Sequence, residues 1–249
     1  MPESFQFPRV ARFNGNLLRP SHRKRCYGHL PRQRANARAG EADLSIAQPL
    51  TLAPGVLLWR EYFSKSAQEK LLNDVLERVA QAPFYQPAMP GTGKPFSVEE
   101  TNFGVLGWVA DKSGYRYQPM HPVTGAFWPD IPPVLLALWE AVSDGAPPPQ
   151  CCLINLYRAG ARMGLHQDRD EAALDAPVVS VSLGDSAQFR IGGVKRGGPT
   201  RSVRLVSGDV VMLGGAARLA YHGIDRILPG TSTLVPGGGR INLTLRRVN

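Results

Sequence analysis

Apolar residues are spaced in two different ways along the chain. Between residues 65 and 81 they recur every three or four positions, which predicts an amphipathic helix. A second, shorter helix is predicted over 134–142, directly after a pair of prolines that suits a helix start. The apolar run 55–59 predicts a first strand. Residues 84–132 combine prolines, glycines and scattered aromatic residues, which predicts mostly irregular structure.

After residue 150 the pattern changes to short apolar runs separated by Gly, Asp and Pro. The predicted strands are 151–157, 178–183, 187–191, 202–207, 209–213, 219–222 and 240–246. Several short strands in about 100 residues indicate a β-sandwich or a jelly roll. We therefore expect a mostly β protein with flanking helices (α+β), in one domain over 49–249. Residues 49–149 would form a mixed α/β segment, with the helices and a lid, and residues 150–249 the β core.

The N-terminal segment differs from the rest in composition and charge. Residues 1–48 are rich in Arg, Pro, Asn and Gly and show no sustained apolar period, which predicts a disordered arm. Nine Lys or Arg against one acid give residues 1–40 a net charge of +8, out of +9 for the whole chain. Such an arm can bind phosphate backbones without reading their sequence. A solvated tail that binds nothing is the alternative.

Composition also bounds the location of the protein. No apolar run reaches about 18 residues, so no membrane span is expected. The first residues are polar, with Arg9 and Arg12 early, and lack the apolar core of a secretory signal. An organelle transit peptide is the weaker alternative for this Arg-rich start. Three cysteines, two of them adjacent, fit a reducing compartment. We expect a cytoplasmic monomer.

His166 and Asp168 form the first chemical signal. With one residue between them, both side chains point the same way from an extended segment and could hold one ion. His222, at the end of the predicted strand 219–222, is the best candidate for a third ligand. Two histidines and one carboxylate form the facial triad of non-haem Fe(II) oxygenases. Zinc hydrolases use a similar set, often with HExxH spacing, which is absent here. An ordinary hydrogen-bonded His–Asp pair is the simpler alternative.

The C-terminal run 240–246 alternates strictly between polar and apolar residues. Arg240, Asn242, Thr244 and Arg246 would project to one face of a strand and the apolar residues to the other. Two inward arginines are costly in a core unless they meet anions. A dicarboxylate would satisfy them, because guanidinium groups form bidentate pairs with carboxylates. A half-exposed strand with its polar face in water is the alternative.

Taken in order, these motifs resemble the AlkB family of Fe(II)/2-oxoglutarate dioxygenases, in particular its bacterial DNA-repair branch. The resemblance starts near residue 52 and reaches the end of the chain. The segments that carry it are 101–104, 106–108, 114–117, 128–129, 155–157, 166–171, 180–184, 208–211, 221–224 and 240–246. It implies a double-stranded β-helix, a jelly-roll variant, with an N-terminal α/β nucleotide-recognition lid.

The resemblance also implies roles for individual residues. The implied Fe(II) ligands are His166, Asp168 and His222. The implied 2-oxoglutarate contacts are Asn155, Tyr157, Arg240, Asn242 and Arg246, with Arg240 on the distal carboxylate and Arg246 on the carboxylate near iron. The implied substrate contacts are Trp108, Tyr115, Asp170, Glu171 and Arg196. Without the resemblance, Trp108 is as well explained by core packing beside Leu106.

The implied activity is oxidative dealkylation of N-alkylated nucleobases in single- or double-stranded DNA, with RNA as a further candidate. The enzyme would convert 2-oxoglutarate and O2 to succinate and CO2 and release formaldehyde. One alternative is a 2-oxoglutarate-dependent hydroxylase of a protein or small molecule. Another is a non-catalytic nucleic-acid-binding module. The acidic pair Glu99 and Glu100 departs from the family pattern, and we expect it to repel phosphates near the lid.

Deleting residues 1–40 should flatten the dependence of log affinity on log salt for duplex DNA. Each phosphate that the arm neutralises adds about −0.9 to that slope. The turnover number on a short, saturating oligonucleotide should hardly change, because the candidate chemistry lies after residue 150. Salt-titrated binding of the full-length and truncated proteins measures the effect. Identical slopes would show that the arm contributes nothing to DNA binding.

Overall fold

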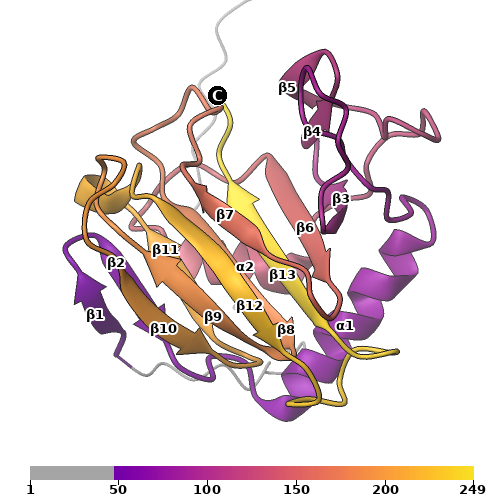
Figure 1. Cartoon of the computed structure of the whole chain (residues 1–249). Helices are drawn as coiled ribbons and strands as arrows, with labels where there is room; N and C mark the ends of the chain where they lie inside the picture. Colours follow the sequence, from indigo (N-terminus) through magenta and orange to yellow (C-terminus); the bar gives the residue numbers. More distant parts are fainter. Residues whose placement is uncertain (1–47) are drawn as a thin grey trace, which may run out of the picture. The chain divides into compact units, whose positions relative to one another are not determined.

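Two antiparallel sheets form the body of the protein, as the computed structural model of residues 48–249 shows (Figure 1). The larger sheet has the strand order β1-β2-β11-β8-β13-β6-β3. Its strands are Leu50–Ala53 (β1), Val56–Trp59 (β2), Glu99–Phe103 (β3), Cys151–Tyr157 (β6), Val178–Gly184 (β8), Val210–Leu213 (β11) and Arg240–Arg246 (β13). The smaller sheet has the order β10-β9-β12-β7. Its strands are Met163–His166 (β7), Ser186–Ile191 (β9), Arg201–Leu205 (β10) and His222–Leu228 (β12). The arrangement confirms the predicted jelly roll.

Helices cover the outer face of the larger sheet. These are α1 (Lys65–Val79) and α2 (Pro133–Val142), close to the predicted 65–81 and 134–142. Leu72 of α1 and Leu138 of α2 belong to one buried cluster with Ile154 and Leu243 of the sheet. A second cluster, which includes Phe189 and Ile224, fills the space between the sheets. The larger sheet is thus covered on both faces, which explains why every residue of β6 and β13 is buried.

A separate two-stranded hairpin stands beside the open end of the sandwich (Figure 1). It consists of β4 (Gly107–Asp111) and β5 (Gly114–Gln118). Gly107 packs directly against the Trp128 indole: an added Cβ would lie 2.4 Å from the ring. Side chains of β3 fasten the hairpin, because Asn102 accepts from the Trp108 backbone N–H at 3.0 Å and donates to its carbonyl at 2.9 Å. We refer to this hairpin as the lid.

The segment 84–132 is mostly irregular, as predicted, but it also contains three strands that were not predicted, β3, β4 and β5. β3 reads EETNF and lacks an apolar alternation. Its polar side chains nevertheless have buried partners: the Thr101 hydroxyl donates to the Ala82 carbonyl at 2.7 Å. Local polarity therefore concealed a strand that the fold buries.

The predicted strand 219–222 was also wrong. The strand is β12, which begins at His222 and continues to Leu228, whereas residues 219–221 follow the short 3-10 helix Gly215–Ala217. Arg226 is exposed in β12 and Asp225 is half-buried, and these two charged residues interrupted the apolar pattern. The four-residue strands β1 and β7 were not predicted either, because so short a run carries little periodicity.

Strands from both halves of the chain share the larger sheet. β1, β2 and β3 precede residue 150 and pair into the same sheet as β6, β8, β11 and β13. The β core therefore extends beyond the expected 150–249, and the single domain over 49–249 remains a proposal. The predicted arm 1–48 lies almost wholly outside the described residues. Within 48–249, no helix is both long and apolar enough to cross a membrane.

Candidate metal centre and cosubstrate pocket

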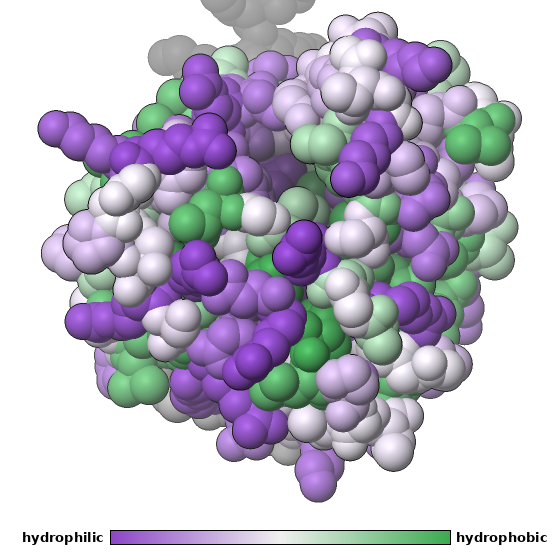
Figure 2. Space-filling model, in the orientation of Figure 1, coloured by the Kyte–Doolittle hydropathy of each residue, from purple (hydrophilic) through white to green (hydrophobic). Residues whose placement is uncertain are grey.

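A cavity of about 890 Å³ opens between the two sheets and the lid. All thirteen predicted site residues line it: Trp108, Tyr115, Asn155, Tyr157, His166, Asp168, Asp170, Glu171, Arg196, His222, Arg240, Asn242 and Arg246. Figure 2 shows that this face of the molecule is hollowed and that many hydrophilic side chains surround the hollow. Its size lies in the usual range for ligand sites, roughly 300–1,000 Å³.

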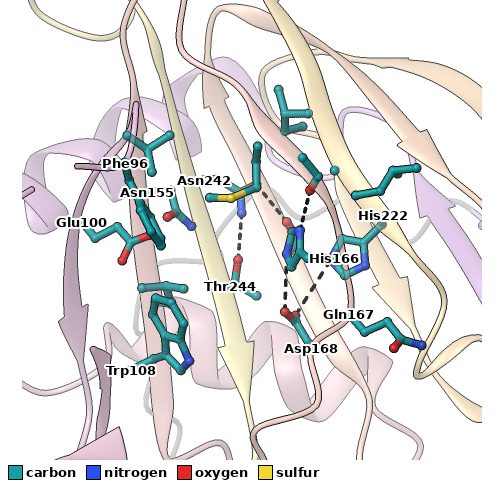
Figure 3. A pocket seen from close by; sticks show the side chains of 18 of the residues that line it. Phe96, Glu100, Trp108, Asn155, His166, Gln167, Asp168, His222, Asn242 and Thr244 are labelled. Carbon is teal, nitrogen blue, oxygen red and sulfur yellow. Dashed lines mark hydrogen bonds and ion pairs between the residues drawn. The ribbon is translucent and has the colours of Figure 1, made fainter. Parts of the chain in front are cut away.

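The pairing of β12 with β7 brings the two histidines together. His222 lies opposite His166 in the register, and the two ring centroids are 4.6 Å apart. Gly223 permits this approach, because an added Cβ would lie 2.5 Å from the Met163 carbonyl oxygen. Asp168 follows β7 by two residues and completes the group. Residues that are 54 positions apart in sequence thus meet at one end of the cavity (Figure 3).

The donor atoms of these three residues converge as a metal site requires. One ligand atom from each of His166, Asp168 and His222 lies within 4.8 Å of the others. The His166 Nε2 atom is 3.7 Å from Asp168 Oδ1, and the His222 Nε2 atom is 4.0 Å from Asp168 Oδ2. Each ring places Nδ1 2.9 Å from a backbone carbonyl, that of Gly164 or Ala220. An Nδ1–H that donates there leaves Nε2 free to bind a metal.

The electrostatics of the group also suit a cation. Burial by itself raises the pKa of Asp168, but Arg246 and the two histidines outweigh it and hold that pKa below its usual range. Burial and the neighbouring His166 lower the pKa of His222 to about 4. At neutral pH the carboxyl is therefore charged and the His222 ring neutral. Asp168 Oδ2 is buried without a hydrogen-bond partner among the described residues. A divalent ion such as Fe(II) would satisfy this set.

Arg240 is a buried cation with unsatisfied donors. Its residue is 1% exposed, and burial lowers the pKa of its guanidinium to about 10. Nη2 donates to Ser182 Oγ at 2.9 Å and to Asn242 Oδ1 at 2.5 Å. Nε and Nη1 have no partner within 48–249. Buried donors of this kind are costly unless an acceptor reaches them. An anion that enters the cavity, such as the distal carboxylate of 2-oxoglutarate, would supply one.

The other predicted cosubstrate residues surround this arginine. The Tyr157 ring lies under the Arg240 guanidinium, with 5.4 Å between the charge centre and the ring centroid. Asn155 Oδ1 is buried and unpaired in the described part of the chain. Asn242 uses Nδ2 to donate to Thr244 at 2.7 Å, while Oδ1 accepts from Arg240. In this structure Asn242 therefore orients Arg240, and its direct contact with the cosubstrate remains a prediction.

Arg246 connects the cosubstrate strand to the metal group. Its Nη2 lies 2.9 Å from Asp168 Oδ1 and its Nε lies 3.6 Å from Glu171 Oε1. Tyr117 of the lid also donates to Glu171. Arg218, which the sequence analysis did not identify, binds the Glu171 carboxylate at 3.1 Å and the Asp168 carbonyl at 2.6 Å. Arg218 is nearly fully buried and lies outside every recognised motif, so only its contacts show that it positions the ligand segment.

The lid places aromatic surface at the cavity mouth. The Trp108 and Tyr115 rings stack with centroids 5.3 Å apart at an angle of 22°. The Trp108 indole N–H donates to Asp170 Oδ2 at 2.9 Å, which fixes the lid to the segment that carries Asp168. Arg196 lies exposed in the loop after β9 and borders the same mouth. The structure thus brings the predicted substrate residues together, and their roles remain predictions.

The expectation for Glu100 was wrong. We expected this acid to repel phosphates near the lid, but it is 1% exposed and lines the cavity interior. The alternation of β3 explains the difference: Glu100 lies opposite Asn155 of β6 and shares its face of the sheet. Glu99 points to the opposite face and does not line the cavity.

A jelly roll with a two-histidine, one-carboxylate group and two buried arginines defines a non-haem iron oxygenase that uses a keto-acid cosubstrate. The sequence matches the 2OG-Fe(II) oxygenase superfamily over residues 55–246. An α-ketoglutarate-dependent dioxygenase AlkB homolog from Caulobacter vibrioides is 61% identical over 204 residues, covering 81% of this chain and 91% of that protein. AlkB of Escherichia coli K12 is 44% identical over 200 residues, covering 79% and 91%. The chain belongs to the AlkB family of Fe(II)- and 2-oxoglutarate-dependent dioxygenases.

More distant relatives agree with this placement. A solved structure, described as the structure of OsALKBH1, superposes with a TM-score of 0.67 at 32% identity. The match covers 80% of this chain and 99% of that one. An Arabidopsis thaliana protein named a DNA N(6)-methyladenine demethylase is 31% identical over 228 residues, which cover 79% of this chain and 49% of that protein. The resemblance to the family is thereby confirmed.

Replacing His166, Asp168 or His222 with Ala should abolish turnover and weaken metal binding, because two ligands hold Fe(II) poorly. Titration with Co(II), followed by its absorption spectrum, measures the binding separately from activity. Asp225→Ala, which removes a carboxyl group from β12 outside the cavity, is the matched control. Full activity in all three variants under limiting Fe(II) would contradict the assignment.

Arg240→Ala should raise the apparent Michaelis constant for 2-oxoglutarate strongly. Loss of one partner from a buried ion pair costs about 3–5 kcal/mol. Arg240→Lys should recover only part of the affinity, because lysine lacks the forked donor geometry. Steady-state kinetics at varied 2-oxoglutarate test both variants against Arg226→Ala, an exposed arginine of β12. An unchanged constant in Arg240→Ala would place the dicarboxylate elsewhere.

Proposed function

We propose that this dioxygenase oxidatively dealkylates N-alkylated nucleobases in DNA, with RNA as a further candidate. One observation carries the proposal. The metal ligands and the stacked Trp108–Tyr115 pair line the same cavity, so a flat ring held by the lid lies within reach of the metal centre. Aromatic side chains stack on any base, and a base must leave the duplex stack to enter such a pocket.

Two groups of cavity residues have different roles in the proposed reaction. His166, Asp168 and His222 would hold Fe(II), which with 2-oxoglutarate and O2 supplies the oxidant that hydroxylates the alkyl carbon. Arg240 and Arg246 orient the cosubstrate through its two carboxylates. The hydroxylated methyl group then leaves the base nitrogen as formaldehyde, while the cosubstrate leaves as succinate and CO2.

The lid presents the base and limits its motion. Asp170 fixes the Trp108 ring through a 2.9 Å hydrogen bond, so the ring can serve as a rigid stacking surface. Positioning of this kind lowers the barrier because the reacting atoms are held close together. The name of one comparison protein, the Arabidopsis DNA N(6)-methyladenine demethylase, supports the substrate class. We also propose that the protein acts as a cytoplasmic monomer.

A panel of oligonucleotides, each with one N-methylated base, tests the proposal. With methylated DNA, we expect formaldehyde and succinate to form in equal amounts. With the unmethylated sequence, we expect little of either product. Methylated peptides serve as the second arm. If methylated peptides stimulate succinate formation and methylated oligonucleotides do not, the result would favour the hydroxylase alternative. The Asp168→Ala variant supplies the background rate.

A further inference from the structure

Glu100 is a buried carboxyl group that the metal and cosubstrate chemistry does not use. It lies in β3 and points into the cavity between Phe96, Asn155 and Trp108 (Figure 3). Its backbone is fixed, because the N–H donates to the Tyr85 carbonyl at 2.8 Å and the carbonyl accepts from Tyr85 N at 2.9 Å. Its Oε2 atom is buried without any hydrogen-bond partner in 48–249. An unsatisfied polar atom in a fixed position needs a ligand to compensate it.

The charged and titratable groups around Glu100 do not satisfy it. Arg246 is the cation whose charge reaches Glu100, but its Nη2 and Nε are directed to Asp168 and Glu171. Tyr85 and Tyr157 also approach, and burial raises the pKa of both phenols, so they stay neutral. Phe96 and Leu153 on the same wall are apolar, and no hydrogen bond joins Asn155 to Glu100 in the described chain. A molecule bound in the cavity could therefore supply the partner that Glu100 lacks in the described chain.

The position of Glu100 determines which part of a ligand it meets. Glu100 and Trp108 lie on the wall opposite the metal ligands in Figure 3. A base that stacks on Trp108 would therefore present its ring edge to Glu100. A carboxylate oxygen accepts hydrogen bonds and attracts positive charge.

We propose that Glu100 is a specificity-determining residue that recognises the polar edge of the target base and favours alkylated bases that carry a positive charge over neutral ones. The inference rests on the proposed function and assigns to Glu100 a part in selecting its substrate. Alkylation of a ring nitrogen such as N1 of adenine leaves the base cationic, whereas N3-methylthymine is neutral. A cation next to a desolvated carboxylate is stabilised strongly, because the low local dielectric enhances their attraction.

This role predicts a pH dependence. Burial raises the pKa of Glu100 to about 8, against a smaller opposing effect of Arg246, so the free protein holds a largely protonated carboxyl at neutral pH. A cationic base favours the charged form, so its binding displaces the proton. The kcat/KM for a cationic base should therefore rise as the pH increases from neutral towards 8, relative to that for a neutral base. The neighbouring Arg246, Tyr85 and Tyr157 do not titrate in this range.

The test compares two single-stranded oligonucleotides of one sequence, with N1-methyladenine or N3-methylthymine at the same position. Formaldehyde release gives kcat/KM for each, and their ratio measures the preference for the charged base. Glu100→Gln, which keeps the shape and removes the charge, should lower this ratio about tenfold, the size of a lost hydrogen bond to a charged group. It should also remove the rise of the ratio with pH. Glu99→Gln, on the opposite face of the same strand, should leave both unchanged.

A second variant distinguishes recognition of the base by Glu100 from a purely structural role of this residue. Glu100→Met fills the same space with an apolar chain and should lower the ratio at least as much as Glu100→Gln. An unchanged ratio in Glu100→Gln, or an equal loss on both oligonucleotides in the two variants, would overturn the inference. Failure of the proposed function would look different, because the unaltered enzyme would then release formaldehyde from neither oligonucleotide.

Discussion

The ion pair between Asp168 and Arg246 joins the two functional ends of the cavity. Both side chains are almost fully buried, and their charged atoms lie 2.9 Å apart. Either charge alone would be expensive in the interior, whereas together they offset each other's desolvation. Asp168 follows the edge strand β7 of the smaller sheet, and Arg246 ends β13 near the centre of the larger one. The pair therefore fixes the metal ligands relative to the strand that carries the cosubstrate arginines.

Several polar groups in this cavity are left incomplete by the protein itself. Arg240 lacks partners for two donor atoms, Asp168 Oδ2 and Asn155 Oδ1 lack donors, and so does Glu100 Oε2, all within the described chain. Each deficit has a definite chemical complement: an anion for the arginine, a metal ion for the aspartate, a donor for the asparagine, and a donor or cation for the glutamate. Unsatisfied groups reduce the free energy of unfolding. Ligands that complete them stabilise the folded state by the free energy of their binding.

The lid is fastened to the same network. Asp170 holds Trp108, and Tyr117 donates to Glu171, whose other oxygen binds Arg218. A shift of the lid would thus displace the segment that carries Asp168, which lies two residues before Asp170. This connection gives a physical route by which the seating of a base could affect the metal ligands. These hydrogen bonds add to the apolar contacts that Val109 and Trp108 of the hairpin make with the body of the protein.

Sequence alone determined the parts of this protein that repeat a local pattern. The helix 65–81 and the strand 240–246 were predictable because burial of a face imposes a period of 3.6 or 2 on the chain, and the strand 151–157 because it is a short apolar run. The same alternation separated Arg240 and Arg246 from the apolar residues between them, and the motif resemblance assigned them to a cosubstrate. Only the tertiary structure decided that the polar strand β3 is buried, that His222 begins rather than ends its strand, and that Glu100 faces inward. These features depend on which distant strand lies alongside, and a local pattern does not encode contacts between residues far apart in the chain.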